Sequence, residues 1–171
     1  MTDTRATQAV RPAAPGIDPR GPRVAATITS LVLALVLLTA PSAFATTLLA
    51  LQTVVFAVGA TAGVQRTPYA WFFRRVVRPR LDPPAESEDP RPPRFAQTVG
   101  LAFAVVGLVG LLSGVTALGL VAVGLALVAA LLNAVFDYCL GCEMYLLIRR
   151  LRPATTHDVT INPDKKKEVT A

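Results

Sequence analysis

The chain has 171 residues, of which 53% are hydrophobic and only 16% are charged, and it carries a net charge of +6. This is the composition of a membrane protein rather than of a soluble domain. The basic excess does not indicate nucleic-acid binding, because no aromatic-basic module accompanies it. The bases instead flank long apolar runs, where they orient a protein in the bilayer and bind anionic lipid headgroups.

The first third of the chain predicts a tail followed by a helical hairpin. Residues 1–23 are rich in proline and in small and polar residues, so we expect a disordered cytoplasmic tail. Apolar runs at 24–40 and 44–64 follow, separated by 41–43 alone. With a helical rise of about 1.5 Å per residue, each run can cross an apolar layer of about 30 Å. The two runs are therefore predicted to be membrane spans.

A cleaved signal peptide is the alternative interpretation of the first run. Ala43-Phe44-Ala45 satisfies the small-x-small rule, which would give a mature N-terminus at Thr46. The second apolar run follows immediately, however, and leaves no exported domain to deliver. We therefore favour a retained first span.

The segment after the first hairpin predicts an amphipathic helix at the membrane interface, over 67–78. Thr67 is suited to cap the helix, and Pro68 to stand at its first position. Tyr69, Phe72, Phe73 and Val76 recur at helical spacing, whereas Arg74, Arg75 and Arg78 gather on the opposite side and Trp71 can lie at headgroup depth. Such a helix is typical of proteins that anchor to lipid.

The second half repeats the plan of a hairpin. Residues 79–94 are predicted to be a proline-rich cytoplasmic loop, 95–113 and 115–138 to be the third and fourth spans, and 153–171 to be a disordered cytoplasmic tail. The predicted fold is all-α: a polytopic membrane protein with four transmembrane helices in two tandem hairpins, plus the interfacial helix.

The distribution of arginine predicts the orientation. Every arginine falls in the N-terminal tail, in 66–94 or in 149–152, and neither hairpin tip carries one. The positive-inside rule then places both termini and the central loop in the cytoplasm of a multi-pass protein of the cell membrane. The spans carry no charge at mid-depth, and Gln52 and Asn133 are the only strongly polar side chains well inside them, which disfavours a proton pump or an ion carrier.

An internal repeat relates the two halves. Residues 22–28 resemble 93–99 at an offset of 71, and 71–75 resemble 146–150 at an offset of 75. Since a unit of two spans returns to the side where it began, the halves should be parallel and related by a pseudo-twofold axis along the membrane normal. In this alignment the two cysteines correspond roughly to Val64 and Thr67.

The candidate functional site is the pair formed by Cys139 and Cys142, the only cysteines of the chain. Placed three apart on a helix, they would lie about 60° apart on one face. C-x-x-C spacing on the cytosolic side is typical of redox chemistry, in which one thiol reacts and the other resolves a mixed disulfide. Glu143, four residues after Cys139, is the candidate proton acceptor.

Two other roles for the cysteines remain open. They can be small packing residues near a helix end. Metal binding is disfavoured, because one C-x-x-C supplies half of a tetrahedral site and the only histidine, His157, lies in the tail. A homodimer that pairs two dithiols would complete four ligands, so a homo-oligomer remains possible. No cofactor and no metal is predicted for the single chain.

Three segments resemble a known family: DPRGPR at 18–23, PRFAQ at 93–97 and CLGCEMY at 139–145. With them the chain resembles the actinobacterial membrane proteins of domain-of-unknown-function family 4395 (DUF4395), over roughly 16–152. The resemblance implies several spans and an association with thioredoxin-like and sulfur-transfer proteins, and it implies no established activity.

Two functional hypotheses follow. The first is a membrane thiol-disulfide or sulfur relay that exchanges with a cytosolic thioredoxin-like or sulfur-transfer protein through Cys139 and Cys142. The second is a non-catalytic membrane scaffold in which the cysteines pack and the arginine-rich central segment binds a partner or anionic lipid.

Overall fold

The computed structural model describes residues 16–82 and 87–151. The predicted C-terminal tail, most of the N-terminal tail and the middle of the proline-rich loop lie outside these residues. Within them, every regular element is a helix. Four helices are long and apolar enough to cross a membrane: α1 (Arg20–Thr39), α2 (Ala43–Thr61), α4 (Arg91–Leu112) and α5 (Thr116–Phe136). The predicted all-α, polytopic membrane fold is confirmed.

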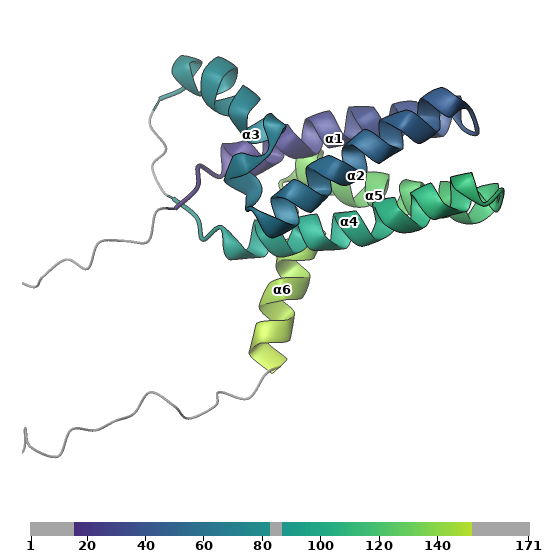
Figure 1. Cartoon of the computed structure of the whole chain (residues 1–171). Coiled ribbons are helices and arrows are strands. Elements are labelled where there is room, and N and C mark those ends of the chain that lie inside the picture. The colour runs from purple at the N-terminus through teal and green to yellow at the C-terminus, as the bar shows by residue number, and fades with distance from the viewer. Residues whose placement is uncertain (1–15, 83–86, 152–171) are drawn as a thin grey trace, which may run out of the picture.

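The four spans form a bundle of two hairpins laid side by side (Figure 1). α1 packs against α2 and α5, and α4 packs against the same two helices, so the spans close into a ring. In the repeat, α1 is equivalent to α4 and α2 to α5, so the contact between α1 and α5 is equivalent to the contact between α4 and α2. The hairpin tips lie together at one end of the bundle, and the beginnings of α1 and α4 lie at the other end (Figure 1).

A pair of equivalent arginines joins the halves. Arg23, near the start of α1, donates from Nε and Nη2 to the carbonyl oxygens of residues 134 and 135 at 3.1 and 3.3 Å. Arg94, at the corresponding place in α4, donates in the same way to the carbonyl oxygens of residues 60 and 61 at 2.7 and 2.6 Å. Each arginine therefore satisfies the last carbonyls of a span in the other half. These contacts support the predicted repeat.

The repeat begins earlier in the chain than the sequence comparison placed it. Residues 18–23 read DPRGPR and residues 89–94 read DPRPPR. In both, the aspartate accepts a hydrogen bond on Oδ1 from the backbone N–H two residues later, at 3.0 Å for Asp18 and 2.9 Å for Asp89. This local turn starts α1 and α4 four residues before the predicted spans.

The pseudo-twofold axis passes through a small backbone bridge. Ile17 and Glu88, which are 71 residues apart, donate their N–H groups to each other's carbonyl oxygens at 2.9 Å. Equivalent residues can pair with one another in this way only close to a twofold axis. The bridge thus holds the starts of the two hairpins together.

The core follows the same symmetry. Buried residues of the first hairpin recur as buried residues of the second: Leu33 and Val36 as Ala104 and Gly107 at an offset of 71, and Ala45, Leu49 and Gln52 as Gly119, Val123 and Ala126 at an offset of 74. The second set is smaller, and a Cβ on Gly107 would lie 3.3 Å from Leu49 Cδ2. Large side chains of one half therefore fill the space that small residues leave in the other.

The interfacial segment between the hairpins is a chain of short helices: η1 (Val64–Arg66), α3 (Pro68–Phe72), a π-helical turn η2 (Phe73–Val77) and η3 (Arg78–Arg80). Thr67 caps α3 as predicted, accepting on Oγ1 from Ala70 N–H at 3.2 Å. Phe73 packs inward and is buried, whereas Phe72 and Val76 are exposed on the outer surface, and a π-helical turn begins at Phe73.

One buried polar group ties this segment to the bundle. Gln52, which is 1% exposed, accepts a hydrogen bond on Oε1 from the Tyr69 hydroxyl at 2.6 Å. Its Nε2 donates to Thr29 Oγ1 at 3.5 Å. Gln52 in α2 therefore links α1 and α3, as expected of a polar side chain within a membrane bundle.

Candidate dithiol site

The second half ends in a short helix that is separate from the fourth span. α5 ends at Phe136, and Asp137 takes a left-handed conformation with φ of 58°. Gly63 follows α2 with φ of 98°, 74 residues earlier. The chain then forms α6 (Leu140–Leu151), which packs mainly on α4 and runs across the bundle axis (Figure 1). α6 is the counterpart of α3.

Cys139 lies immediately before α6, and only Cys142 is helical. The expectation that both cysteines share one face of a helix is therefore wrong, because the chain must turn at Asp137 before α6 can begin. Cys139 instead caps α6: Cys142 N–H donates to Cys139 Sγ at 3.4 Å, and Glu143 N–H donates to the Cys139 carbonyl at 3.0 Å.

The same capping geometry is present in the first half. Thr67 Oγ1 accepts from Ala70 N–H, and Trp71 N–H donates to the Thr67 carbonyl at 3.1 Å. Cys139 and Cys142 therefore occupy the places of Thr67 and Ala70, at an offset of 72, and not those of Val64 and Thr67. The predicted alignment was wrong by about one helical turn, because the offset between the halves falls from 74 to 72 after α5.

The two sulfurs are at disulfide distance, and Cys139 and Cys142 form a disulfide with a Cα–Cα separation of 5.2 Å. Both residues are half-buried. A C-x-x-C pair whose first cysteine caps a helix is suited to disulfide formation, because the first helical turn brings its third residue back over the cap.

Close packing on α4 fixes the position of the disulfide. A Cβ on Gly141 would lie 2.6 Å from both Cα and Cβ of Ala96, so the start of α6 contacts α4 nearly backbone to backbone. One turn later, the rings of Phe95 and Tyr145 pack against each other at a tilt of 47°, with centroids 5.8 Å apart. Only glycine fits at position 141, where α6 crosses α4.

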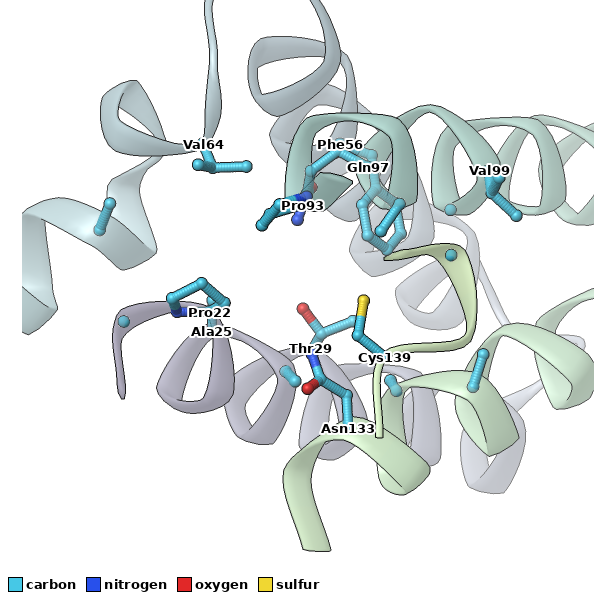
Figure 2. A pocket seen from close by; sticks show the side chains of 18 of the residues that line it. Pro22, Ala25, Thr29, Phe56, Val64, Pro93, Gln97, Val99, Asn133 and Cys139 are labelled. Carbon is cyan, nitrogen blue, oxygen red and sulfur yellow. The ribbon is translucent and has the colours of Figure 1, made fainter. Parts of the chain in front are cut away.

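A cavity of about 600 Å³ lies beside the disulfide, at the end of the bundle where α1 and α4 begin. Its walls are mostly apolar, with Phe56 and Phe103 among them. Polar and charged groups also line it, from Asp18, Thr29, Gln65, Arg74, Arg78, Gln97 and Asn133. Cys139 also lines the cavity, and Figure 2 shows its sulfur directed into the space between these side chains. Cys142 is not part of the lining.

Comparison with family models shows which protein family the chain belongs to. The family model described as Domain of unknown function (DUF4395) matches residues 17–150, from the Ile17–Glu88 bridge to the last turn of α6. The chain belongs to the DUF4395 family. No curated protein and no solved structure matches it.

Sequence reasoning placed Glu143 in the site of this DUF4395 protein as a proton acceptor. Its carboxylate is exposed, and the contact that the structure gives it with the pair is the backbone hydrogen bond to Cys139. The catalytic roles of Cys139, Cys142 and Glu143 stay predictions.

Two residues of the site were missed or given another role. Gln97 was read only as part of the repeat, yet its Oε1 is buried and has no hydrogen-bond partner among the described residues. Asn133 stood out in the sequence only as a polar side chain within a span, and the structure places it in the cavity wall. The signal for Gln97 was available in the sequence: it is an uncharged polar residue near the start of an apolar span.

Proposed function

We propose that this DUF4395 protein is a membrane thiol-disulfide relay, in which Cys139 and Cys142 exchange electrons or sulfur with a soluble thioredoxin-like or sulfur-transfer protein. The observation that carries the proposal is the disulfide at the start of α6, formed at the edge of a cavity. In a C-x-x-C pair, one cysteine forms the mixed disulfide and the other resolves it.

The comparison of the two halves argues against a purely structural role for the cysteines. In the first half a threonine and an alanine give the same helix start, with a hydroxyl as the cap. A cap needs only one small acceptor side chain, and serine, threonine, aspartate and asparagine are the usual residues. Cysteines at both positions add a reversible bond that the cap itself does not require.

The local geometry supports the chemistry of exchange. A partner thiolate attacks Cys142 Sγ, the Cys139–Cys142 bond breaks, and Cys139 leaves as a thiolate while a mixed disulfide joins Cys142 to the partner. The Cys142 N–H, 3.4 Å from Cys139 Sγ, stabilises that negative charge. The partner's second thiol then attacks the mixed disulfide, which leaves the partner oxidised and the pair reduced.

Sulfur transfer would use the same pair. The Cys142 thiolate would take the outer sulfur of a partner persulfide, leaving the partner as a thiolate. Cys139 would then displace that sulfur as hydrosulfide and restore the Cys139–Cys142 disulfide.

The proposed orientation places the disulfide on the cytoplasmic side of the cell membrane. All arginines among the described residues lie at the end of the bundle where α1 and α4 begin, whereas the hairpin tips carry no charge. The positive-inside rule assigns that end, with both termini, to the cytoplasm. A soluble cytosolic partner would then reach α6 directly.

A lipid-binding role for the central segment is compatible with the relay. Arg74, Arg75, Arg78 and Arg80 are exposed, and Trp71 is 57% exposed beside them. An exposed tryptophan next to a cluster of arginines fits a bilayer surface with anionic headgroups. This surface favours the scaffold hypothesis only if the cysteines prove unreactive.

Trapping of the mixed disulfide tests the relay. Cys139→Ser leaves Cys142 free to capture a soluble thiol protein, so a covalent adduct that dithiothreitol releases is expected in membranes. Cys142→Ser should trap less, because Cys139 faces the cavity, and the double variant should trap none. If no adduct forms with either single variant and the double variant grows as wild type under thiol stress, the cysteines only pack and the scaffold hypothesis stands.

A further inference from the structure

We propose that the cavity beside Cys139 binds a lipid-soluble quinone, which accepts two electrons from the Cys139–Cys142 dithiol. The inference rests on the proposed relay and names its membrane-side substrate class. A relay needs an acceptor as well as a soluble donor, and the two sulfurs are placed differently: Cys139 lines the cavity and Cys142 does not.

The cavity suits such a ligand in size and position. Its volume of about 600 Å³ is within the range of small-molecule sites, about 300–1,000 Å³. Residues of all four spans line one side of it, where a lipid-soluble ring can enter between the helices, and the charged and polar residues Asp18, Gln65, Arg74 and Arg78 line its other side. Phe56 and Phe103 supply aromatic walls for a flat ring.

Two amides in the wall suit both redox states of a quinone. Gln97 in α4 has a buried Oε1 without a partner among the described residues, and Asn133 in α5 lines the same cavity. A quinone oxygen accepts hydrogen bonds, whereas a quinol hydroxyl also donates one. A side-chain amide carries a donor and an acceptor, so it can bond either form.

Both amides lie in the second half of the repeat, and the equivalent residues of the first half carry no amide. At an offset of 71, Gln97 corresponds to Ala26, and at an offset of 74, Asn133 corresponds to Gly59. Gln97 packs directly on Gly59, whose added Cβ would lie 2.8 Å from Gln97 Cγ. The symmetry of the core therefore breaks at the cavity, as it does at the cysteines.

The electron transfer balances without any further reactant. Cys139, as a thiolate, adds to the quinone ring. The Cys142 thiol then attacks Cys139 Sγ, the Cys139–Cys142 bond forms, and the bond between sulfur and the ring breaks with its electron pair left on the ring. The two protons released by the thiols convert the quinone to the quinol. The soluble partner then reduces the disulfide through Cys142.

The experiment uses the full chain in lipid nanodiscs, reduced with dithiothreitol and desalted. Decylubiquinone and a short-chain menaquinone analogue are the probes, and quinol absorbance and the thiol count are the readouts. One quinol per disulfide formed is expected. Gln97→Leu and Asn133→Leu should each raise the half-saturating quinone concentration at least tenfold. Thr98→Ala, at an exposed residue next to Gln97, is the matched control.

The possible outcomes separate the two claims. If a soluble dithiol protein reduces the oxidised chain but neither quinone oxidises the reduced chain, the quinone inference is overturned and the relay stands. If it does neither, the relay itself fails. Equal quinone reduction by Gln97→Leu, Asn133→Leu and Thr98→Ala would place the reaction outside the cavity. As a check that needs no cavity variant, quinone should slow alkylation of Cys139 in Cys142→Ser, and a lack of protection would contradict binding there.

Discussion

The contact between Gly141 and Ala96 gives a sharp prediction about what positions the disulfide. In Gly141→Ala the new Cβ would lie 2.6 Å from Cα and Cβ of Ala96, whereas carbon atoms pack at about 3.5–4.0 Å. α6 must therefore move away from α4 by about 1 Å. Overpacking of this kind costs about 1–3 kcal/mol. Alanine also gains up to about 1 kcal/mol of helix propensity over glycine.

Gly124→Ala is the matched control, because nothing lies within 4 Å of a Cβ added there. It should receive the propensity gain alone, so the two variants should differ by about 1–3 kcal/mol in the stability of the helix that carries them. Amide hydrogen exchange in nanodiscs should show α6 opening faster in Gly141→Ala, by up to roughly thirtyfold for a net loss of about 2 kcal/mol. Ala96→Gly should restore only part of the protection in the double variant, because it removes the contact with Cβ of Ala96 but not the 2.6 Å contact with Cα. Equal exchange of α6 in Gly141→Ala and wild type would refute the close contact.

Three further predictions test the architecture. Arg94→Met removes two hydrogen bonds to the end of α2 and should lower the free energy of unfolding in detergent by about 1–2 kcal/mol, allowing for the exposure of Arg94. Arg91→Met, which removes only an exposed ion pair, should change it by less than about 0.5 kcal/mol. Equal losses would contradict the role of Arg94 in joining the two halves. Tyr69→Phe leaves Gln52 Oε1 without its donor and should lower the free energy of unfolding by about 1 kcal/mol in the same assay. An unchanged free energy would mean that this hydrogen bond does not stabilise the contact between α3 and the bundle. Ala43→Cys, with the native cysteines replaced by serine, should react in intact cells with a maleimide that cannot cross membranes; labelling only after the cells are opened would reverse the orientation.

The sequence was sufficient for the features that follow from local physics. Long uncharged runs predicted four helices, because only helices satisfy their own backbone within lipid. The Pro-Arg start of each half predicted the repeat, and the structure shows the reason: Arg23 and Arg94 cap spans of the opposite half. Thr67 before Pro68 predicted a capped helix, which the structure contains.

Features that depend on tertiary contact or on an unusual backbone were not predictable in the same way. Asp137 takes a left-handed conformation, which aspartate can adopt but which the sequence alone does not predict. The predicted fourth span therefore extended too far, and Cys139 was predicted to be helical. A π-helical turn begins at Phe73, which hydrophobic spacing does not reveal. The cavity exists because all nine helical elements of the described residues contribute to its lining, and no single stretch of sequence encodes it.

The most direct test of the relay is the redox state of the Cys139–Cys142 pair in growing cells. Acid quenching followed by alkylation with a mass-tagged maleimide separates the dithiol from the disulfide on a gel. A working relay predicts that both forms are present and that the ratio shifts within minutes when the cells receive a thiol oxidant or reductant. A pair that stays entirely in one form through both treatments would contradict a relay at this site.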